Sequence, residues 1–206
     1  MKKKTNFARI YLVRHGEYTN KKNIIVGYLP LPLSPKGKKQ AKEAGLFLKK
    51  KNVGAIFVSP QKRTQETARI ISQVISKGKL KVITDKDLHE SAFGHAREGL
   101  TLREAAQKNL KESLIYWRTP ARLKTGETFD NMAGRMLKAI NRGLKKYPGK
   151  NLVFVSHRDP ILALLMKISK RSFNDLHKIK SFCPMGSISE VWSVGKRLVN
   201  KTYFAN

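Results

Sequence analysis

The segment Arg9-Ile10-Tyr11-Leu12-Val13-Arg14-His15-Gly16-Glu17 decides the fold of this chain. Its first half is apolar, β-branched and aromatic, which predicts a buried strand, and the apolar run stops at Arg14-His15-Gly16. In open α/β sheets, ligands bind at the carboxyl ends of the strands. The strand therefore delivers a cation and an imidazole to a ligand-binding edge. Gly16 is expected to allow a positive φ or the close approach of a ligand to the backbone.

The composition suits one folded domain with a strongly basic surface. At 206 residues and 40% hydrophobic content the chain can bury a single core, so we expect one domain over residues 1–206. The 43 Lys and Arg residues against 14 Asp and Glu give a formal net charge of +29, which attracts polyanions and phosphorylated metabolites. Because the lysines are dispersed along the chain, they favour a solvated surface over a dedicated nucleic-acid groove.

Cysteine content and hydropathy indicate a reducing compartment. Cys183 is the single cysteine, so no intrachain disulfide can form and a disulfide-dependent secreted scaffold is excluded. The basic start at Met1-Lys2-Lys3-Lys4 is followed by an apolar run that Arg9 interrupts and that lacks a small-residue cleavage site. No apolar run approaches the roughly 20 residues of a membrane span. We therefore expect a cytoplasmic protein that does not associate with membranes.

Strand and helix signals alternate along the rest of the chain. Short apolar runs predict strands, the last two forming a hairpin, over residues 55–58, 80–84, 151–155, 188–194 and 198–203. Serine followed by proline predicts the start of a helix at Ser34-Pro35 and again at Ser59-Pro60. Apolar residues at helical spacing predict helices over about residues 35–50, 60–75 and 129–144, and a further helix is predicted over about residues 101–117. Residues 161–168 are apolar all round, which predicts a helix buried against the sheet.

Three of the predicted strands end at residues suited to anion binding. The first ends at Arg14-His15, the second at Ser59 with Arg63 in the following helical turn, and the fourth at His157. In a parallel sheet these ends lie on one edge, so two imidazoles and two guanidiniums can converge there. Arginine supplies planar pairs of donors that match phosphate oxygens. The pattern therefore indicates a phosphate site.

A set of motifs in a fixed order resembles the histidine phosphatase superfamily, also called the phosphoglycerate mutase-like family. The matching segments are Leu12-Val13-Arg14-His15-Gly16-Glu17, Leu33-Ser34-Pro35-Lys36-Gly37, Ser59-Pro60-Gln61-Lys62-Arg63-Thr64-Gln65-Glu66-Thr67-Ala68, Leu88-His89-Glu90, Phe93-Gly94, Glu98-Gly99, Gly126-Glu127-Thr128 and Val155-Ser156-His157. The resemblance implies an α/β fold, a three-layer α/β/α sandwich with a mostly parallel central sheet. It is completed by a small helical cap over about residues 91–125. It also implies phosphoryl transfer through a phosphohistidine.

The resemblance also implies roles for individual residues. His15 would be the nucleophile, Glu90 the general acid, and Arg14, Arg63 and His157 the phosphate pocket, with His157 protonated. An imidazole nitrogen can attack phosphorus and divide one displacement into formation and hydrolysis of a covalent intermediate. The leaving oxygen needs a proton, which a carboxyl group can donate. A pocket this rich in cations is expected to need neither a metal nor a cofactor.

Two positions depart from the family pattern. Relatives often carry Thr or Ser after Arg-His-Gly-Glu and Asn six residues after the nucleophile, where this chain has Tyr18 and Lys21. Asn20 is therefore a candidate phosphate donor one residue out of place. Arg158-Asp159-Pro160 stands where Gly-Gly often follows the second histidine. The backbone N–H of Arg158 is a candidate phosphate donor, and its side chain could select a more acidic substrate.

Other polar residues receive different interpretations. Glu98 is the main alternative to Glu90 as the acid, whereas Glu17 is expected to orient the first loop. His89 is interpreted as a neighbour of the acid. His95 and His177 are interpreted as surface or packing residues. His89, Glu90 and His95 do not form a His-Glu-x-x-His pair, which argues against a metallohydrolase.

Three functions fit these residues. A phosphomonoesterase acting on phosphorylated small molecules is favoured, because only a compact cap fits between Glu90 and Gly126, whereas cofactor-dependent phosphoglycerate mutases are usually longer. The mutase remains an alternative, since Trp117-Arg118 faintly resembles a mutase segment. A non-catalytic module that binds RNA or another polyanion is the third, motivated by the net charge but lacking an RNA-binding motif. The substrate and the oligomeric state stay open.

Overall fold

A six-stranded sheet forms the centre of the protein in the computed structural model, which describes residues 8–92, 97–124, 126–176, 183–194 and 197–203. The strands are β1 (Ile10–Arg14), β2 (Val53–Val58), β3 (Val82–Thr84), β4 (Asn151–Ser156), β5 (Ile188–Val194) and β6 (Arg197–Tyr203). The α-helices are α1 (Pro35–Lys49), α2 (Lys62–Ser76), α4 (Leu102–Lys108), α5 (Leu110–Arg118), α6 (Phe129–Lys146) and α7 (Arg158–Ile168). Short 3₁₀ turns are η1 (Lys86–Leu88), η2 (Pro120–Arg122) and η3 (Phe173–Asp175).

The sheet is mostly parallel, as predicted. Its order is β3-β2-β4-β1-β5-β6, in which β3, β2, β4 and β1 pair in parallel. The hairpin of β5 and β6 joins antiparallel to β1. The carboxyl ends of β1, β2 and β4 therefore meet on one edge, which is the arrangement that the phosphate-site hypothesis requires.

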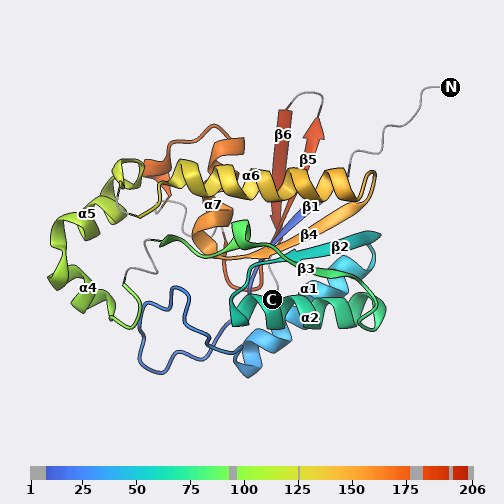
Figure 1. The fold of residues 1–206 in the computed structure, drawn as a ribbon, viewed down its shortest axis with the longest axis horizontal. Helices are drawn as coiled ribbons and strands as arrows, with labels where there is room; N and C mark the ends of the chain where they lie inside the picture. Colours follow the sequence, from blue (N-terminus) through green and yellow to red (C-terminus); the bar gives the residue numbers. More distant parts are fainter. Residues whose placement is uncertain (1–7, 93–96, 125, 177–182, 195–196, 204–206) are drawn as a thin grey trace.

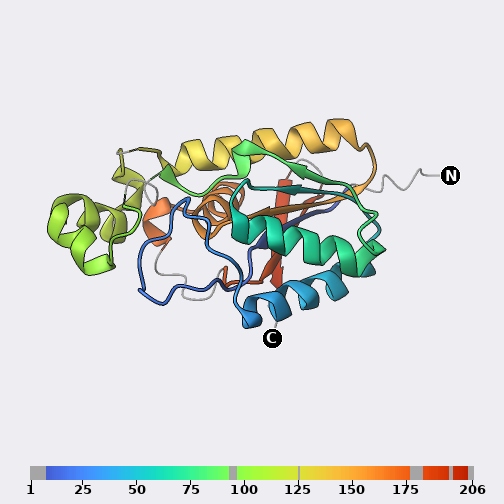
Figure 2. The same cartoon turned by 60° about the horizontal axis from the view of Figure 1, so that its bottom comes forward.

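Helices cover both faces of the sheet, which confirms the three-layer α/β/α class. Figures 1 and 2 show α1 and α2 on one face and α6 and α7 on the other. Successive strand residues point to opposite faces. Leu12 and Phe154 thus belong to the core under α6 and α7, whereas Val13 and Val155 belong to the core under α1 and α2. The same alternation explains why the central strands are apolar throughout.

The two predicted Ser-Pro helix starts have different outcomes. Ser34 caps α1 as expected, because its side chain accepts a hydrogen bond from the N–H of Gly37. The prediction at Ser59-Pro60 was wrong: α2 begins at Lys62, and its N-cap residue is Gln61. The Ser59 hydroxyl contacts His157 and Gln61 rather than the helix backbone. A local contact with Gln61 and a tertiary contact with His157 therefore take the hydroxyl that would otherwise serve as a cap. Arg63 still lies in the first turn, as predicted.

The segment expected to form a cap contains two helices instead of the single helix predicted over residues 101–117. Helix α4 ends at Asn109, and the Asn109 side chain accepts a hydrogen bond from the N–H of Glu112 at the start of α5. Asparagine readily caps a new helix in this way, which explains the break. Figure 1 shows α4 and α5 at one end of the molecule, clear of the helical layers.

Gly16 is needed for close packing, and its φ is not positive, in contrast to one of the two expectations from the sequence. A Cβ at Gly16 would lie 2.3 Å from the carbonyl oxygen of Gly37, and a Cβ at Gly37 would lie 1.8 Å from that of Glu17. Neither glycine has a positive φ. The two glycines let the loop after β1 pass directly against the first turn of α1, which fixes where β1 ends relative to the helix.

Other predicted boundaries shift by a few residues. Strand β3 is shorter than the predicted segment 80–84, and α7 begins at Arg158 rather than Ile161. The terminal hairpin matches the prediction closely. Within the described ranges, no helix is both long enough and apolar enough to cross a membrane.

Candidate functional site

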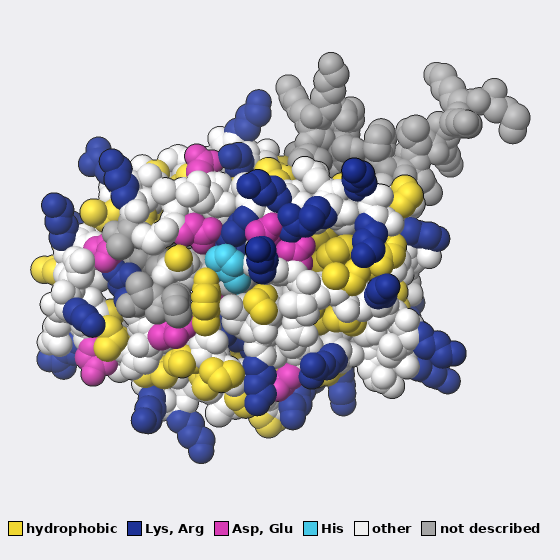
Figure 3. Space-filling view, viewed as in Figure 1, with side chains coloured by type: hydrophobic (Ala, Val, Ile, Leu, Met, Phe, Trp, Pro, Cys, Tyr) yellow, Lys and Arg dark blue, Asp and Glu magenta, His cyan; other side chains and the backbone are white. Residues whose placement is uncertain are grey.

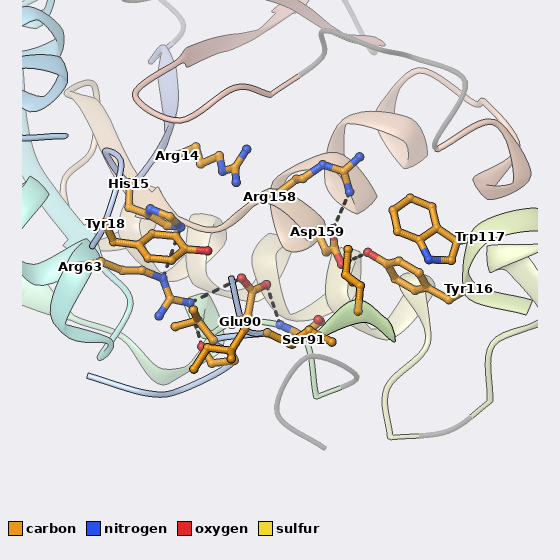
Figure 4. Close-up of a pocket in the computed structure, with 15 residues that line it drawn as sticks. Arg14, His15, Tyr18, Arg63, Glu90, Ser91, Tyr116, Trp117, Arg158 and Asp159 are labelled. Carbon is orange, nitrogen blue, oxygen red and sulfur yellow. Dashed lines mark hydrogen bonds and ion pairs between the residues drawn. The ribbon is translucent and has the colours of Figure 1, made fainter. Parts of the chain in front are cut away.

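The strand ends bring the two predicted histidines into contact. The N–H of His15 donates to the carbonyl of Ser156 (3.1 Å), and the N–H of Ser59 donates to that of Val155 (3.0 Å), so the ends of β1, β2 and β4 are aligned. The rings of His15 and His157 lie 5.2 Å apart between centroids. The His15 ring lines a cavity of about 510 Å³, whose wall also includes Arg14, Arg63, Glu90 and Arg158, and His157 lies behind it. Figure 4 shows His15, Arg14, Arg63, Glu90 and Arg158 around the cavity.

The His15 side chain presents an unprotonated nitrogen at the cavity. Its Nδ1 lies 2.8 Å from the carbonyl oxygen of Gly16, which can only accept, so Nδ1 carries the proton. Its Nε2 accepts from Nε of Arg63 at 3.3 Å and therefore keeps its lone pair in the ring plane. Burial, and then the nearby charges of Arg63 and Arg14, hold the pKa of His15 well below its ordinary value. A neutral imidazole is the nucleophilic form.

His157 lies between α2 and Glu90. Its Nδ1 accepts from Nη2 of Arg63 at 3.1 Å, and its Nε2 lies 2.8 Å from the Ser59 hydroxyl and 3.1 Å from Oε1 of Gln61. Because the arginine donates to Nδ1, the remaining ring proton belongs on Nε2. Burial and the charge of Arg63 lower the pKa of His157 well below its ordinary value. The imidazole is thus neutral in this structure, in contrast to the protonated form expected from the sequence.

Two of the three arginines in the cavity wall, Arg14 and Arg63, lie next to His15. Arg63 is fully buried, and its Nη2 also donates to the carbonyl of Gly27 at 2.8 Å, which ties the loop before α1 to the site. Arg14 donates through Nη1 to the carbonyl of Cys183 at 2.8 Å. Its Nε is buried without a hydrogen-bond partner among the described residues. A buried donor without an acceptor is costly, so this N–H is ready for an anionic ligand.

The Glu90 carboxyl group lies close to both the Arg63 guanidinium and the His157 imidazole. Its Oε2 lies 3.6 Å from Nη2 of Arg63 and 3.5 Å from Nδ1 of His157, and its Oε1 accepts from the N–H of Ser91 at 2.9 Å. Burial raises the pKa of Glu90, as does the neighbouring carboxylate of Asp159, although Arg63 acts in the opposite direction. A carboxyl with a raised pKa can hold a proton for transfer, which is the property of a general acid.

Arg135 on α6 holds the segment that carries Glu90. Its Nη1 donates to the carbonyls of Asp87 and His89, each at 2.8 Å, and Nε and Nη2 bind the carboxylate of Glu127 at 2.6 and 3.0 Å. Nη2 also approaches the carbonyl of Glu90 at 3.4 Å. Both side chains of this ion pair are largely buried. The Gly126-Glu127-Thr128 motif therefore supports the position of Glu90.

A third cluster lies on the side of the cavity toward the cap. The carboxylate of Asp159 accepts from Nη1 of Arg158 at 3.0 Å and from the hydroxyl of Tyr116 at 2.8 Å. Trp117 adjoins them in the cavity wall (Figure 4). The cluster joins the first turn of α7 to α5.

Several predicted residues lie elsewhere. The Asn20 side chain exchanges hydrogen bonds with the backbone of Ile24 and is not part of the cavity wall. Glu98, the main alternative to Glu90 as the general acid, accepts a hydrogen bond from the backbone N–H of Tyr28 and so binds the loop that contains Tyr28. Glu17 accepts from the hydroxyl of Ser34 at 2.8 Å, which agrees with an orienting role. The His89 side chain forms a hydrogen bond with the Tyr28 hydroxyl next to Glu90. The interpretations of His95 and His177 lie outside the described residues.

Some residues of the site had no sequence-based prediction of a role. Tyr18, Gln61 and Tyr116 contact site residues across elements, and Arg135 acts from a helix assigned only to core packing. One signal was available for Arg135, since an arginine borders the otherwise apolar stripe of α6 and a buried cation requires a partner. In the described part of the chain, no three His, Cys, Asp or Glu side chains group as metal ligands.

The fold and site define a class: α/β proteins with two histidines and two arginines at the carboxyl edge of a mostly parallel sheet. The model of the histidine phosphatase superfamily (branch 1) matches residues 10–203. The chain belongs to this superfamily.

The similar sequences and the similar solved structures carry different functional names. An uncharacterised protein of Mycobacterium tuberculosis is 31% identical, covering 95% of each chain. Phosphoglycerate mutase-like protein 4 of Arabidopsis thaliana is 33% identical over 77% of this chain and 70% of its own. The structure of a mycobacterial glucosyl-3-phosphoglycerate phosphatase superimposes with a TM-score of 0.81 at 21% identity, covering 97% and 99% of the chains.

Proposed function

We propose that this protein is a phosphomonoesterase that hydrolyses phosphorylated small molecules through a phosphohistidine on His15. The observation that supports it most is the unprotonated Nε2 of His15, which lies beside Arg63 and near an Arg14 N–H that has no hydrogen-bond partner in the described part of the chain. A nucleophile next to cationic donors is the arrangement that phosphoryl transfer requires.

In the first step, Nε2 of His15 attacks phosphorus and the bond between phosphorus and the alcohol oxygen breaks. Glu90, whose raised pKa favours the protonated form, transfers its proton to that oxygen, so the alcohol leaves neutral. Arg14 and Arg63 hold the equatorial oxygens throughout. In this proposal the bound phosphate dianion raises the pKa of His157, whose protonation then adds a third donor.

In the second step, water attacks the phosphohistidine. The Glu90 carboxylate accepts a proton from the water, the bond between phosphorus and Nε2 breaks, and inorganic phosphate leaves with His15 neutral again. Glu90 thus returns to its protonated form, and the cycle needs no other proton donor or acceptor. Asn20 is omitted from the phosphate pocket because its side chain is engaged with Ile24.

A mutase is the second candidate, and the name of the Arabidopsis relative favours it. A mutase must keep a sugar acid with two phosphates in the site while the acid turns round. The cap helices α4 and α5 contain 7 and 9 residues and leave the cavity open beside Trp117, so we favour release of the product.

Phosphate release from a panel of phosphomonoesters, including 3-phosphoglycerate, tests the proposal directly. The assay is run in EDTA with the native protein and with His15→Ala. We expect release that resists EDTA and is lost in the variant. Conversion of 3-phosphoglycerate to 2-phosphoglycerate without release would identify a mutase. The absence of both reactions in a folded native protein would overturn the proposal.

A further inference from the structure

A small apolar cavity opens beside the main one, and we call it the annex. Its volume is about 160 Å³, and it shares Ile25, Leu102, Tyr116 and Trp117 with the cavity at His15. Complete small-molecule sites have volumes of roughly 300–1,000 Å³, so the annex is large enough for only part of a ligand. Its continuity with the main cavity means that this part would belong to a molecule already held at His15.

Apolar faces of the two cap helices form the annex. On α5, Leu110, Leu114 and Trp117 are spaced four and three residues apart and therefore share one face. On α4, Leu102 and Ala105 share a face in the same way. Amphipathic helices usually bury such faces in a core. Here the two faces border the annex instead.

These apolar side chains are unusually exposed. Leu102, Leu110, Leu114 and Trp117 are exposed by 62%, 61%, 41% and 51%, and Leu46 on α1 is the remaining large apolar residue of this kind in the described ranges. Single exposed leucines are common, but a group on one surface marks a binding site. The group lies where the main cavity opens toward the cap.

The annex offers little to a charged ligand. Arg97 is the charged residue in its wall, and the Arg97 guanidinium is ion-paired with the carboxylate of Glu112. The main cavity, in contrast, contains Arg14, Arg63 and Arg158. The two connected cavities therefore differ in chemistry, one cationic and one apolar. A ligand that fits both has an anionic head and an apolar tail.

We propose that the annex binds the alkyl tail of the alcohol leaving group, so that the preferred substrates are phosphomonoesters of amphiphilic alcohols. The inference rests on the proposed function of the cavity at His15. With the phosphoryl group at His15, the tail crosses Leu102 and Trp117, which belong to both walls, and enters between α4 and α5.

Hydrolysis of a homologous series, ethyl, butyl, hexyl and octyl phosphate, tests the proposal. All are used below the concentrations at which they form micelles. Each methylene that leaves water contributes about 0.8 kcal/mol, so we expect kcat/KM to rise by up to about fourfold per buried methylene. Equal values along the series would overturn the proposal.

Variants locate the effect at the annex. In the double variant Leu110→Gln and Leu114→Gln we expect the ratio of kcat/KM for octyl over ethyl phosphate to fall at least about tenfold. Leu46→Gln changes an equally exposed leucine on α1 and should leave the ratio as in the native protein. A ratio that falls equally in both variants, or in neither, would contradict a binding role for the annex.

Binding measurements separate this inference from the proposed function. Calorimetry compares octyl with ethyl phosphate on His15→Ala. Tighter binding of the octyl ester, weakened by the Leu110 and Leu114 substitutions, would support the annex even if no ester were hydrolysed. Equal binding of the two esters would overturn it. A double variant that instead loses self-association in sedimentation, with no change in octyl affinity, would assign the apolar surface to a second copy of the chain.

Discussion

Glu90 and His15 have pKa shifts in opposite directions, and the proposed chemistry needs both. The pKa of Glu90 is raised by burial, so the carboxyl keeps its proton to higher pH than an exposed glutamic acid. The pKa of His15 is lowered by burial and by two arginines, so the imidazole stays neutral to lower pH. Both shifts therefore widen the pH range over which the acid is protonated while the nucleophile is neutral.

We predict that kcat/KM falls as the pH rises through the raised pKa of Glu90, because the acid is then deprotonated. Glu90→Gln should remove this alkaline limb and lower kcat by about 10²–10⁴-fold on an alkyl phosphate, whose leaving group requires a proton. On 4-nitrophenyl phosphate, whose leaving group does not, the loss should be much smaller. Steady-state pH profiles on both esters measure this, and equal losses would argue against Glu90 as the acid.

The residues at the strand ends were predictable because local sequence determines them. One buried strand stops at Arg14-His15 and another stops before His157. Because these strands lie in the parallel part of the sheet, the side chains at their ends meet on one edge. Arg135 was not predictable in the same way, because the carbonyls that it contacts belong to a distant segment. The role of Asn20 could not be decided by spacing, since its short side chain closes a local turn with Ile24.

At the scale of elements, the loop after β1 and helix α1 meet through two glycines. We predict that Gly37→Ala destabilises the protein by about 1–3 kcal/mol or more, because the added Cβ would overlap the carbonyl of Glu17 and neither backbone can easily move. Gly134→Ala in α6 is the matched control. Its Cβ meets nothing within 4 Å, and alanine is the better helix former, so stability should hold or increase. Urea denaturation compares the two, and similar effects would refute the packing argument.

The ion pair of Arg135 and Glu127 connects α6 to the segment before Glu90. Arg135→Met leaves a buried carboxylate without its cation, so we expect a loss of about 3–5 kcal/mol in the free energy of unfolding. Arg135→Met with Glu127→Gln should recover part of that stability. It should still shift the alkaline limb of the kcat/KM profile, because the carbonyls of Asp87 and His89 remain without their donor. An unshifted limb in the double variant would limit Arg135 to a structural role.

Element boundaries were predictable where short-range chemistry decides them and not elsewhere. Ser34 caps α1 from three residues away, so sequence suffices. Ser59 was predicted to act in the same way, but its hydroxyl instead contacts the neighbouring Gln61 and His157, which is distant in sequence. Asn109 divides the predicted cap helix because asparagine can both end one helix and cap the next. The antiparallel position of β5 beside β1 left no local signal, since pairing partners are distant in sequence.

At the scale of the whole molecule, the net charge of +29 is spread over the surface. Figure 3 shows lysine and arginine side chains around the whole visible face, with acidic side chains between them and no single continuous basic stripe. Such a distribution raises the potential around the molecule and favours the approach of small anions.

We predict that added salt lowers kcat/KM for a phosphomonoester dianion, since the Debye length falls from about 30 Å at 0.01 M to about 8 Å at 0.15 M. The change should appear in KM, with kcat nearly constant, because buried groups at His15 are screened less than the surface. Kinetics across a salt series measures this split. Steeply salt-dependent RNA binding that survives His15→Ala, with salt-independent turnover, would instead favour a polyanion-binding module.

Trapping of the covalent intermediate tests the central proposal most directly. The native protein is mixed with a phosphomonoester, quenched under conditions that preserve phosphohistidine, and digested for mass spectrometry, with His15→Asn as the control. We predict one phosphoryl group, attached to His15 at Nε2, that forms faster than phosphate is released and is absent from the variant. A phosphoryl group on another residue, or turnover with no phosphoprotein at any quench time, would contradict the proposal.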